Sequence, residues 1–390
     1  MPADANRVQL LYRNQGTGFD VLGSGAPTEV RFTSESLKQT TDNASSDEIR
    51  DDRQRSDIIR TDIRAEGDIN MELSYGDFDP FFSAALQDAV GAAPAVAWNT
   101  GTTIISSAAC SFAGSVITLD SPTWTNNPEP GDVVQVSLTS KNDGAFTVVS
   151  ATTGTITVNE TLTTESSVTS TITNGDYVVN GTVVSYFELQ KEFLDIASFA
   201  YYKNMVVDSF NLTIEPGSII TGGFSFMGTS ASSVDTLTVT PTGAGTNPVL
   251  NAIDNVGTIA AGTTLGALSG VTQIALTVSN NMRSRSEIGR LGSAQPGSGT
   301  IDVTGTLQMY LAGDTEIDNY LDWDTTALRF AVHNGATNAG MGYSFWLPKV
   351  KFTDGQRVAG GINTDVIAEL SFTAYADADD GTIQIHRATD

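Results

Sequence analysis

Short runs rich in valine, isoleucine and threonine recur along the chain, and glycine, asparagine and aspartate separate them. β-Branched and aromatic residues favour strands, whereas the separating residues favour turns. Apolar and polar residues alternate in several runs, which is typical of strands with one buried and one wet face, and hence of antiparallel sheets. We therefore expect a mainly β protein. The expected inward-facing side chains are Phe210, Leu212, Phe224, Phe226, Phe345 and Leu347.

A shift in composition divides the 390-residue chain. Residues 93–181 are dense in threonine, serine and valine, and Lys141 is their only basic residue. Short predicted strands follow one another closely in this segment, which is typical of a small β-barrel or β-sandwich. We expect it to be an inserted all-β domain that interrupts a discontinuous core formed by residues 1–92 and 182–390.

A strand followed by a turn and a helix is predicted twice. Apolar residues alternate after Gly67, and a helix is expected with Asp79 as its N-cap and Pro80 at its first position. The segment after Gly305 repeats this pattern, and Ile317 falls in its helix. The two copies are either a duplicated unit or a chance likeness between alternating strands. A duplication predicts two related halves packed as a β-sandwich with one or two flanking helices.

No constellation that supports catalysis or holds a cofactor is recognisable in the sequence. His333 and His386 lack metal-ligand spacing, and Cys110 is the only cysteine. Neither a nucleophile elbow nor a phosphate-binding glycine loop occurs. The acidic run 377–380 departs from the calcium-loop pattern. We therefore expect a protein that is not an enzyme and has no cofactor and no metal.

The formal net charge of −25 restricts the partners of the chain. Proteins that bind DNA tightly neutralise its phosphates with basic residues, so tight DNA binding is not expected. The charge fits an acidic surface past which DNA slides, and equally a charge that only keeps a concentrated protein soluble. No apolar stretch has the length of a membrane span, and no signal peptide is recognisable, so we expect no membrane partner and synthesis in a cytoplasm.

The most informative charged segment lies between residues 35 and 66, which lack a sustained apolar period and are expected to form a long loop. Arginine and aspartate interleave in it, a combination that favours planar, bidentate ion pairs. The charges either pair locally in a solvated turn or dock on a complementary surface of a neighbouring subunit, and the embedded isoleucines favour docking. The candidate contact residues are Arg50, Asp51, Arg53, Arg55, Asp57, Ile58, Ile59, Arg60, Asp62 and Arg64.

Several segments of the chain, taken together, resemble one protein family. They are SSDEIRDDRQRSDIIR with AEGDINMELSYGDFDPFFSAAL, the stretch FELQKEFLDIASFAYYKNMVVDSFNLTIEPGSIITGGFSFMG, and the later SNNMRSRSEIG, VTGTLQMYL and FWLPKVKF. In this order they are similar to the major tail proteins, or tail tube proteins, of long-tailed bacteriophages. The resemblance covers residues 1–92 and 182–390 and leaves the inserted segment outside.

The resemblance implies a structural virion protein that is made in the host cytoplasm. Members of this family have a β-sandwich core with a helix, six subunits close into a ring, and the rings stack into the tail tube. DNA passes through the acidic lumen without specific binding. The loop near residues 35–66 is then expected to reach the adjacent ring, the insert to decorate the outer wall, and other tail proteins to bind at the tube ends.

Two other readings of the residues stay open. Another virion or cell-surface β-protein, such as an adhesin or a tail spike, is one of them, although a spike would carry repeats toward its C-terminus and none is seen. A glycan-acting enzyme would need two carboxylates across a cleft with aromatic platforms, and the four tryptophans are scattered in the sequence. Because the sequence shows neither the repeats of a spike nor a recognisable glycan-binding cleft, we expect the protein to work by self-assembly.

Overall fold

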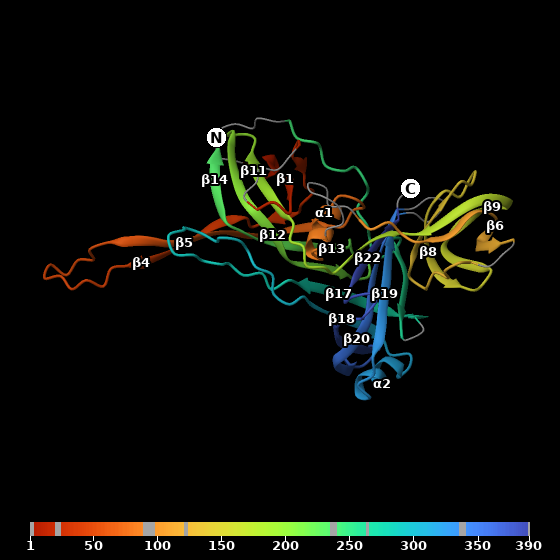
Figure 1. Cartoon of the computed structure of the whole chain (residues 1–390). Helices are drawn as coiled ribbons and strands as arrows, with labels where there is room; N and C mark the ends of the chain where they lie inside the picture. Colours follow the sequence, from red (N-terminus) through yellow and green to blue (C-terminus); the bar gives the residue numbers. More distant parts are fainter. Residues whose placement is uncertain are drawn as a thin grey trace.

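The computed structural model describes residues 4–19, 25–88, 98–120, 124–234, 240–262, 265–334 and 341–388. They form a mainly β fold with two short α-helices, a large antiparallel sheet and a small four-stranded sheet, which confirms the expected mainly β class. A long hairpin projects from one side of a central body, and the small sheet lies on the opposite side (Figure 1).

The large sheet contains 18 strands, and every pairing between them is antiparallel. Its strands are β1 (Val8–Gly16), β2 (Thr28–Glu29), β3 (Ser34–Glu35), β4 (Lys38–Ser45), β5 (Ile58–Glu72), β10 (Asp176–Val179), β11 (Tyr186–Phe193), β12 (Ser198–Ile214), β13 (Thr221–Gly228), β14 (Ser230–Val234), β15 (Val256–Ala261), β16 (Gly266–Ala267), β17 (Val271–Ser279), β18 (Asp302–Tyr310), β19 (Thr326–His333), β20 (Gly342–Ala359), β21 (Val366–Ala374) and β22 (Gln384–Ala388).

The alternating runs of the sequence form the central strands of this sheet. All six expected inward-facing side chains are buried, in β12, β13 and β20. Burying a large apolar side chain contributes about 1.5–3 kcal/mol, so alternation over several strands defines one buried face. The remaining elements are the strands of the small sheet, which are β6 (Thr103–Leu119), β7 (Val133–Ser137), β8 (Gly144–Ala151) and β9 (Thr155–Asn174), the helices α1 (Asp79–Ala85) and α2 (Thr315–Leu321), and the 3₁₀ helix η1 (Ala5–Arg7).

The large sheet curls around α1. The Phe82 ring lies 5.5 Å from Phe224 of β13 and 6.2 Å from Phe345 of β20, measured between ring centroids. Along the ladder of paired strands, β12, β17, β18 and β21 separate β13 from β20. One helical side chain can touch both only if the sheet bends over it. Helix α1 is therefore enclosed by the sheet, and it does not flank the core as we expected.

The start of α1 differs by one residue from the prediction. Its N-cap is Phe78, which makes no side-chain capping bond, and Asp79 is the first helical residue with Pro80 next to it. The Asp79 carboxylate accepts the hydroxyl of Tyr343 and pairs with Arg387. Burial raises the pKa of Asp79, and Arg387 opposes that rise. The carboxylate is thus used in tertiary contacts, which local capping rules do not include.

The second strand-turn-helix segment also forms, as β18 and α2. Ile317 is buried, whereas Leu321 at the end of the helix is exposed. Helix α2 lies on the surface at one end of the body (Figure 1). The two predicted helices therefore exist in different surroundings, and a duplication of the unit remains a hypothesis.

The small sheet has the strand order β6-β9-β7-β8 and its own buried cluster, which includes Phe112 and Phe146. Strand β10, which the sequence placed in the inserted segment, pairs instead with β22 of the large sheet. The two sheets also touch through Val133 and Ala145 of the small sheet and two alanines of the large one. The small sheet thus packs against the body through a buried contact.

Candidate assembly interface

The expected long loop at residues 35–66 is a β-hairpin for most of its length, so that prediction was wrong. Strands β4 and β5 pair from Lys38 opposite Glu66 to Ser45 opposite Ile58. The outer part of the hairpin extends away from the body with neither face covered, whereas its base lies against residues of the body (Figure 1). A strand pair with two wet faces needs no alternation of apolar and polar residues, which is why its sequence shows no strand period. We call residues 38–66 the arm.

Strand β5 passes through two environments. Its second part, from Ala65 onward, pairs with β13 in the body and becomes buried, whereas Ile58 to Thr61 are exposed. Gly67 stands at the transition with φ +149°, and a Cβ atom there would lie 2.6 Å from the Cα atom of Leu37. The arm therefore leaves the body at a position where glycine is required for close backbone approach.

Charged residues at the root of the arm pair with one another. Arg64 Nη1 lies 2.8 Å from Asp42 Oδ2, and Arg64 Nε lies 3.2 Å from Glu66 Oε2. The Thr40 hydroxyl donates to Glu66 over 2.6 Å. This hydroxyl, with further help from Arg64, lowers the pKa of Glu66. Arg64, a candidate contact residue, is thus engaged within its own hairpin.

The end of the arm, residues 46–57, is shaped by local contacts, and we call it the tip. Arg50 donates to both oxygens of Asp52, over 3.0 and 2.8 Å, and the bond lowers the pKa of Asp52. Arg53 has a left-handed backbone with φ 60°. Asp57 Oδ1 accepts the amide of Ile58 over 2.7 Å. These contacts fold the turn but use few of its charges.

Several other candidate residues have exposed side chains with no partner among the residues that the structure describes. Within the described residues, the side chains of Arg53, Arg55 and Arg60 take part in no ion pair or hydrogen bond. Ile58 is 63% exposed and Ile59 is 56% exposed. The Asp51 side chain also has no partner in the described part of the chain, and Asp62 accepts a hydrogen bond from the amide of Ile63 over 2.9 Å. The arm thus combines unpaired charges with exposed isoleucines.

A model of the phage tail tube protein family matches residues 5–374. The chain belongs to this family. It is therefore a structural component of the virion tail and not an enzyme, and self-assembly into a tube follows from the family. The family assignment confirms the resemblance seen in the sequence. It decides against the alternatives of an adhesin, a tail spike and a glycan-acting enzyme. No curated protein matches the chain.

The residues of this tail tube protein that the structure describes contain no group of three or more histidine, cysteine, aspartate or glutamate side chains that could hold a metal ion. Asp377, in the acidic run near the C-terminus, pairs with Lys349 over 2.8 Å, and this contact lowers the pKa of Asp377 to about 2. Among the described helices, none is long and apolar enough to cross a membrane.

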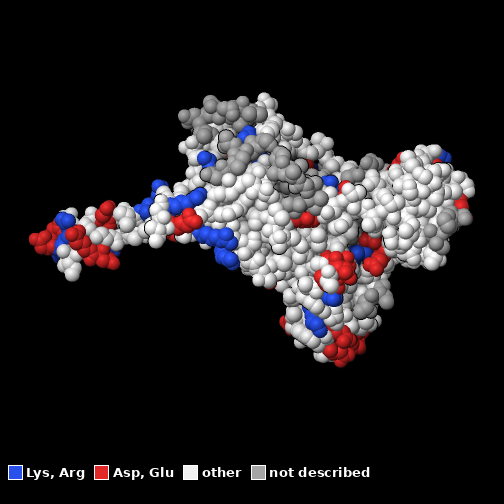
Figure 2. Space-filling model, viewed as in Figure 1, with Lys and Arg blue, Asp and Glu red and all other residues white. Residues whose placement is uncertain are grey.

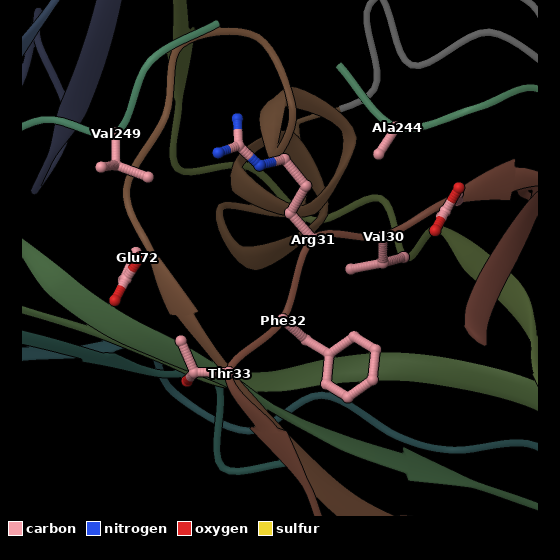
Figure 3. Close-up of a pocket in the computed structure, with 8 residues that line it drawn as sticks. Val30, Arg31, Phe32, Thr33, Glu72, Ala244 and Val249 are labelled. Carbon is pink, nitrogen blue, oxygen red and sulfur yellow. The ribbon is translucent and has the colours of Figure 1, made fainter. Parts of the chain in front are cut away.

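A groove of about 350 Å³ lies beside the segment that connects β2 to β3 (Figure 3). Arg31 in its lining pairs with Asp77 over 3.1 Å and donates to the carbonyl of Asn247 over 2.5 Å. Its cation is therefore used to hold neighbouring segments of the same chain together. Among the described residues of this tail tube protein, the lining of the groove therefore offers no unpaired cation to a neighbouring subunit. The lining residues are Glu29, Val30, Arg31, Phe32, Thr33, Glu72, Ala244 and Val249.

Sequence reasoning missed a second charged feature, residues 283–297, which we call the arginine loop. Arg283, Arg285 and Arg290 are exposed in it. Backbone bonds fold the segment back on itself, with Arg283 opposite Gly297. Three arginines within eight residues are unusual in a chain with 20 basic and 45 acidic residues, and this density is the signal that could have revealed the loop.

Proposed function

We propose that this tail tube protein forms hexameric rings that stack into the tube, and that the arm carries the contact between adjacent rings. The observation that carries the proposal is a hairpin anchored in the large sheet, whose outer half has exposed isoleucines and arginines without a partner among the described residues. The candidate contact residues of the sequence analysis, from Arg50 to Arg64, all lie on this hairpin.

An isolated two-stranded hairpin is at best marginally stable in water, and its free strand edges invite pairing with another chain. Burying an isoleucine side chain contributes about 1.5–3 kcal/mol. Ile58 and Ile59 together therefore supply several kcal/mol to any contact that covers them. A neighbouring subunit is the partner that a self-assembling tail protein always has available.

The remaining parts fit the same assembly. In our proposal the curled large sheet is the tail-tube-type sandwich core, and its exposed edges pair with neighbouring subunits as the ring closes. The small sheet, opposite the arm in Figure 1, belongs to an inserted domain at residues 93–181 on the outer wall of the tube. Other tail proteins bind at the tube ends. DNA passes the acidic lumen without specific binding, since like charges repel.

The experiment reverses two arm arginines in the variant Arg53→Glu/Arg60→Glu. Purified wild type should form tubes in negative-stain electron micrographs, and the variant should form short tubes or none while its circular dichroism stays unchanged. A control with the same change of −4 in charge is Lys141→Glu/Thr164→Glu/Ser166→Glu on exposed positions of the small sheet. Tubes of wild-type length from the arm variant would contradict the proposal.

A further inference from the structure

Charge is distributed unevenly along the arm. The tip, residues 46–57, carries five acidic and three basic residues, a net charge of −2. One of these acids, Asp52, is bound by Arg50. The side chains of Asp47, Glu48 and Asp51 have no partner among the described residues. Figure 2 shows acidic atoms dominating the end of the projection.

The opposite charge lies at the root of the arm. The arginine loop, residues 283–297, carries Arg283, Arg285 and Arg290 against Glu287 as its only acid, a net charge of +2. Its shape is fixed by backbone bonds, since the Arg283 amide donates to Gly297 over 2.9 Å and the Ala294 amide donates to Arg285 over 2.7 Å. Figure 2 shows basic atoms gathered where the projection joins the body.

None of the three loop arginines is neutralised within the described residues. Arg283 and Arg285 have no ion pair there, and the Arg290 guanidinium lies over the Phe19 ring, 5.6 Å from its centroid. Other basic side chains of the body are already paired, such as Arg13 with Glu188 and Lys191 with Glu35. Among the described residues, all three cations of this loop therefore lack an acidic partner.

The loop lies directly against the arm. A Cβ atom at Gly292 would lie 3.2 Å from Ile63 Cγ1 at the base of β5. Strand β5 continues from Ile63 to Ile58, which is roughly 17 Å at ~3.3 Å per residue, and the tip lies beyond its end (Figure 1). A paired hairpin does not fold back over that distance, so the tip of a chain cannot reach its own arginine loop.

We propose that the acidic tip of one copy docks on the arginine loop of a second copy. This inference rests on the proposed function and names the surface that receives the acidic side chains of the tip. Arg53 and Arg60, whose reversal tests the proposed function, then meet acidic side chains elsewhere on the same neighbouring copy. Apolar residues match as well, because Ile49 of the tip is 99% exposed and Ile288 of the loop is fully exposed. Burial of these two side chains adds a contact that salt does not screen.

A contact between the tip of one copy and the arginine loop of another joins two different surfaces. Each copy therefore offers one surface of each kind, a tip and a loop. Such heterologous contacts propagate in one direction and do not close on a pair of subunits. The loop therefore supplies what stacking requires, a receiving surface on every ring for the arms of the next. A symmetric contact between two tips would instead end after one pair.

The test is a charge swap in the full-length protein. The tip variant is Asp47→Arg/Asp51→Arg, and the loop variant is Arg283→Asp/Arg285→Asp. Each alone should reduce the mass of tubes that sediment about tenfold or more, equivalent to ~1.4 kcal/mol per contact. The combined variant should restore tubes because the opposite charges face each other again. The small-sheet control Lys141→Glu/Thr164→Glu/Ser166→Glu should leave the yield unchanged.

Two results would overturn the inference. One is a combined variant that assembles no better than either single variant while its circular dichroism matches wild type. The other is a loop variant with a wild-type yield. If Arg53→Glu/Arg60→Glu still abolishes tubes in either case, the arm carries the contact between rings but its receptor lies elsewhere. If that arm variant also assembles normally, the proposed function itself fails.

Discussion

Arg329 of β19 anchors the small sheet to the body, and its replacement by methionine is the most informative test of that contact. The residue is 4% exposed. Its Nη1 atom lies 2.7 Å from Asp132 Oδ1 and 3.4 Å from Glu129 Oε2, both on the segment that leads into β7. The guanidinium also lies 3.9 Å from the centroid of the Trp346 ring.

The change Arg329→Met keeps most of the side-chain volume but leaves Asp132 buried without its cation. Breaking a buried ion pair by removing one partner costs about 3–5 kcal/mol, and the lost cation–π contact adds ~0.5–2 kcal/mol. Glu129 is more than half exposed, so solvent screens its ion pair with Arg329, which adds little to this cost. The double variant Arg329→Met/Asp132→Asn removes the uncompensated charge, and we expect it to lose roughly 1–3 kcal/mol.

Urea unfolding and limited proteolysis measure the two consequences. The free energy of unfolding of Arg329→Met should fall by the amount given above, and proteases should cut the connections of the small sheet faster than in wild type. The double variant should lie between the two proteins. An unfolding midpoint and a cleavage rate equal to those of wild type in Arg329→Met would show that this ion pair does not anchor the sheet.

Two further predictions concern the arm and a buried acid. The variant Ile58→Ser/Ile59→Ser should leave the unfolding midpoint of the monomer nearly unchanged, since both side chains are more than half exposed. It should weaken assembly by about 1–2 kcal/mol per residue in sedimentation assays, and a wild-type tube yield would contradict this. Burial raises the pKa of Glu160 to about 7, and a hydrogen bond from the Thr147 amide partly opposes this rise. In the folded chain Glu160 therefore stays protonated at pH values above 4.5, its ordinary pKa. The stability that the protonated Glu160 contributes falls as the pH rises from about 4.5 through 7. Glu160→Gln should remove roughly 3 kcal/mol of that fall, measured by urea unfolding between about pH 5 and pH 8. An equally steep fall in the variant would show that Glu160 does not cause it.

Much of the core was predictable from the sequence because burial imposes a period on it. Phe210 and Phe224 alternate with polar or small residues, and each lies on the buried face of its strand, whereas Phe345 stands in a run of β20 that is buried on both faces. The helix after Gly67 was predictable for a similar reason, since proline and apolar spacing mark its first turn. Its enclosure by the sheet was not predictable, because that depends on Phe82 touching strands far apart in the chain.

The arm shows where such patterns stop being informative. Its residues attracted attention through composition, yet their strand structure left no apolar period because solvent covers both faces. The arginine loop was missed because its meaning depends on its place beside Ile63, more than 200 positions earlier in the chain. Asp79 was assigned to a cap because its true partners, Tyr343 and Arg387, are equally distant in sequence.

We propose that the protein assembles into stacked rings held together by the arm. Electron cryomicroscopy of tubes grown from the purified wild-type protein tests it most directly. We expect six-fold rings around a lumen, with each arm crossing to the next ring and its tip against the arginine loop there. Dispersed monomers under all assembly conditions, or rings whose arms touch no neighbouring ring, would contradict it.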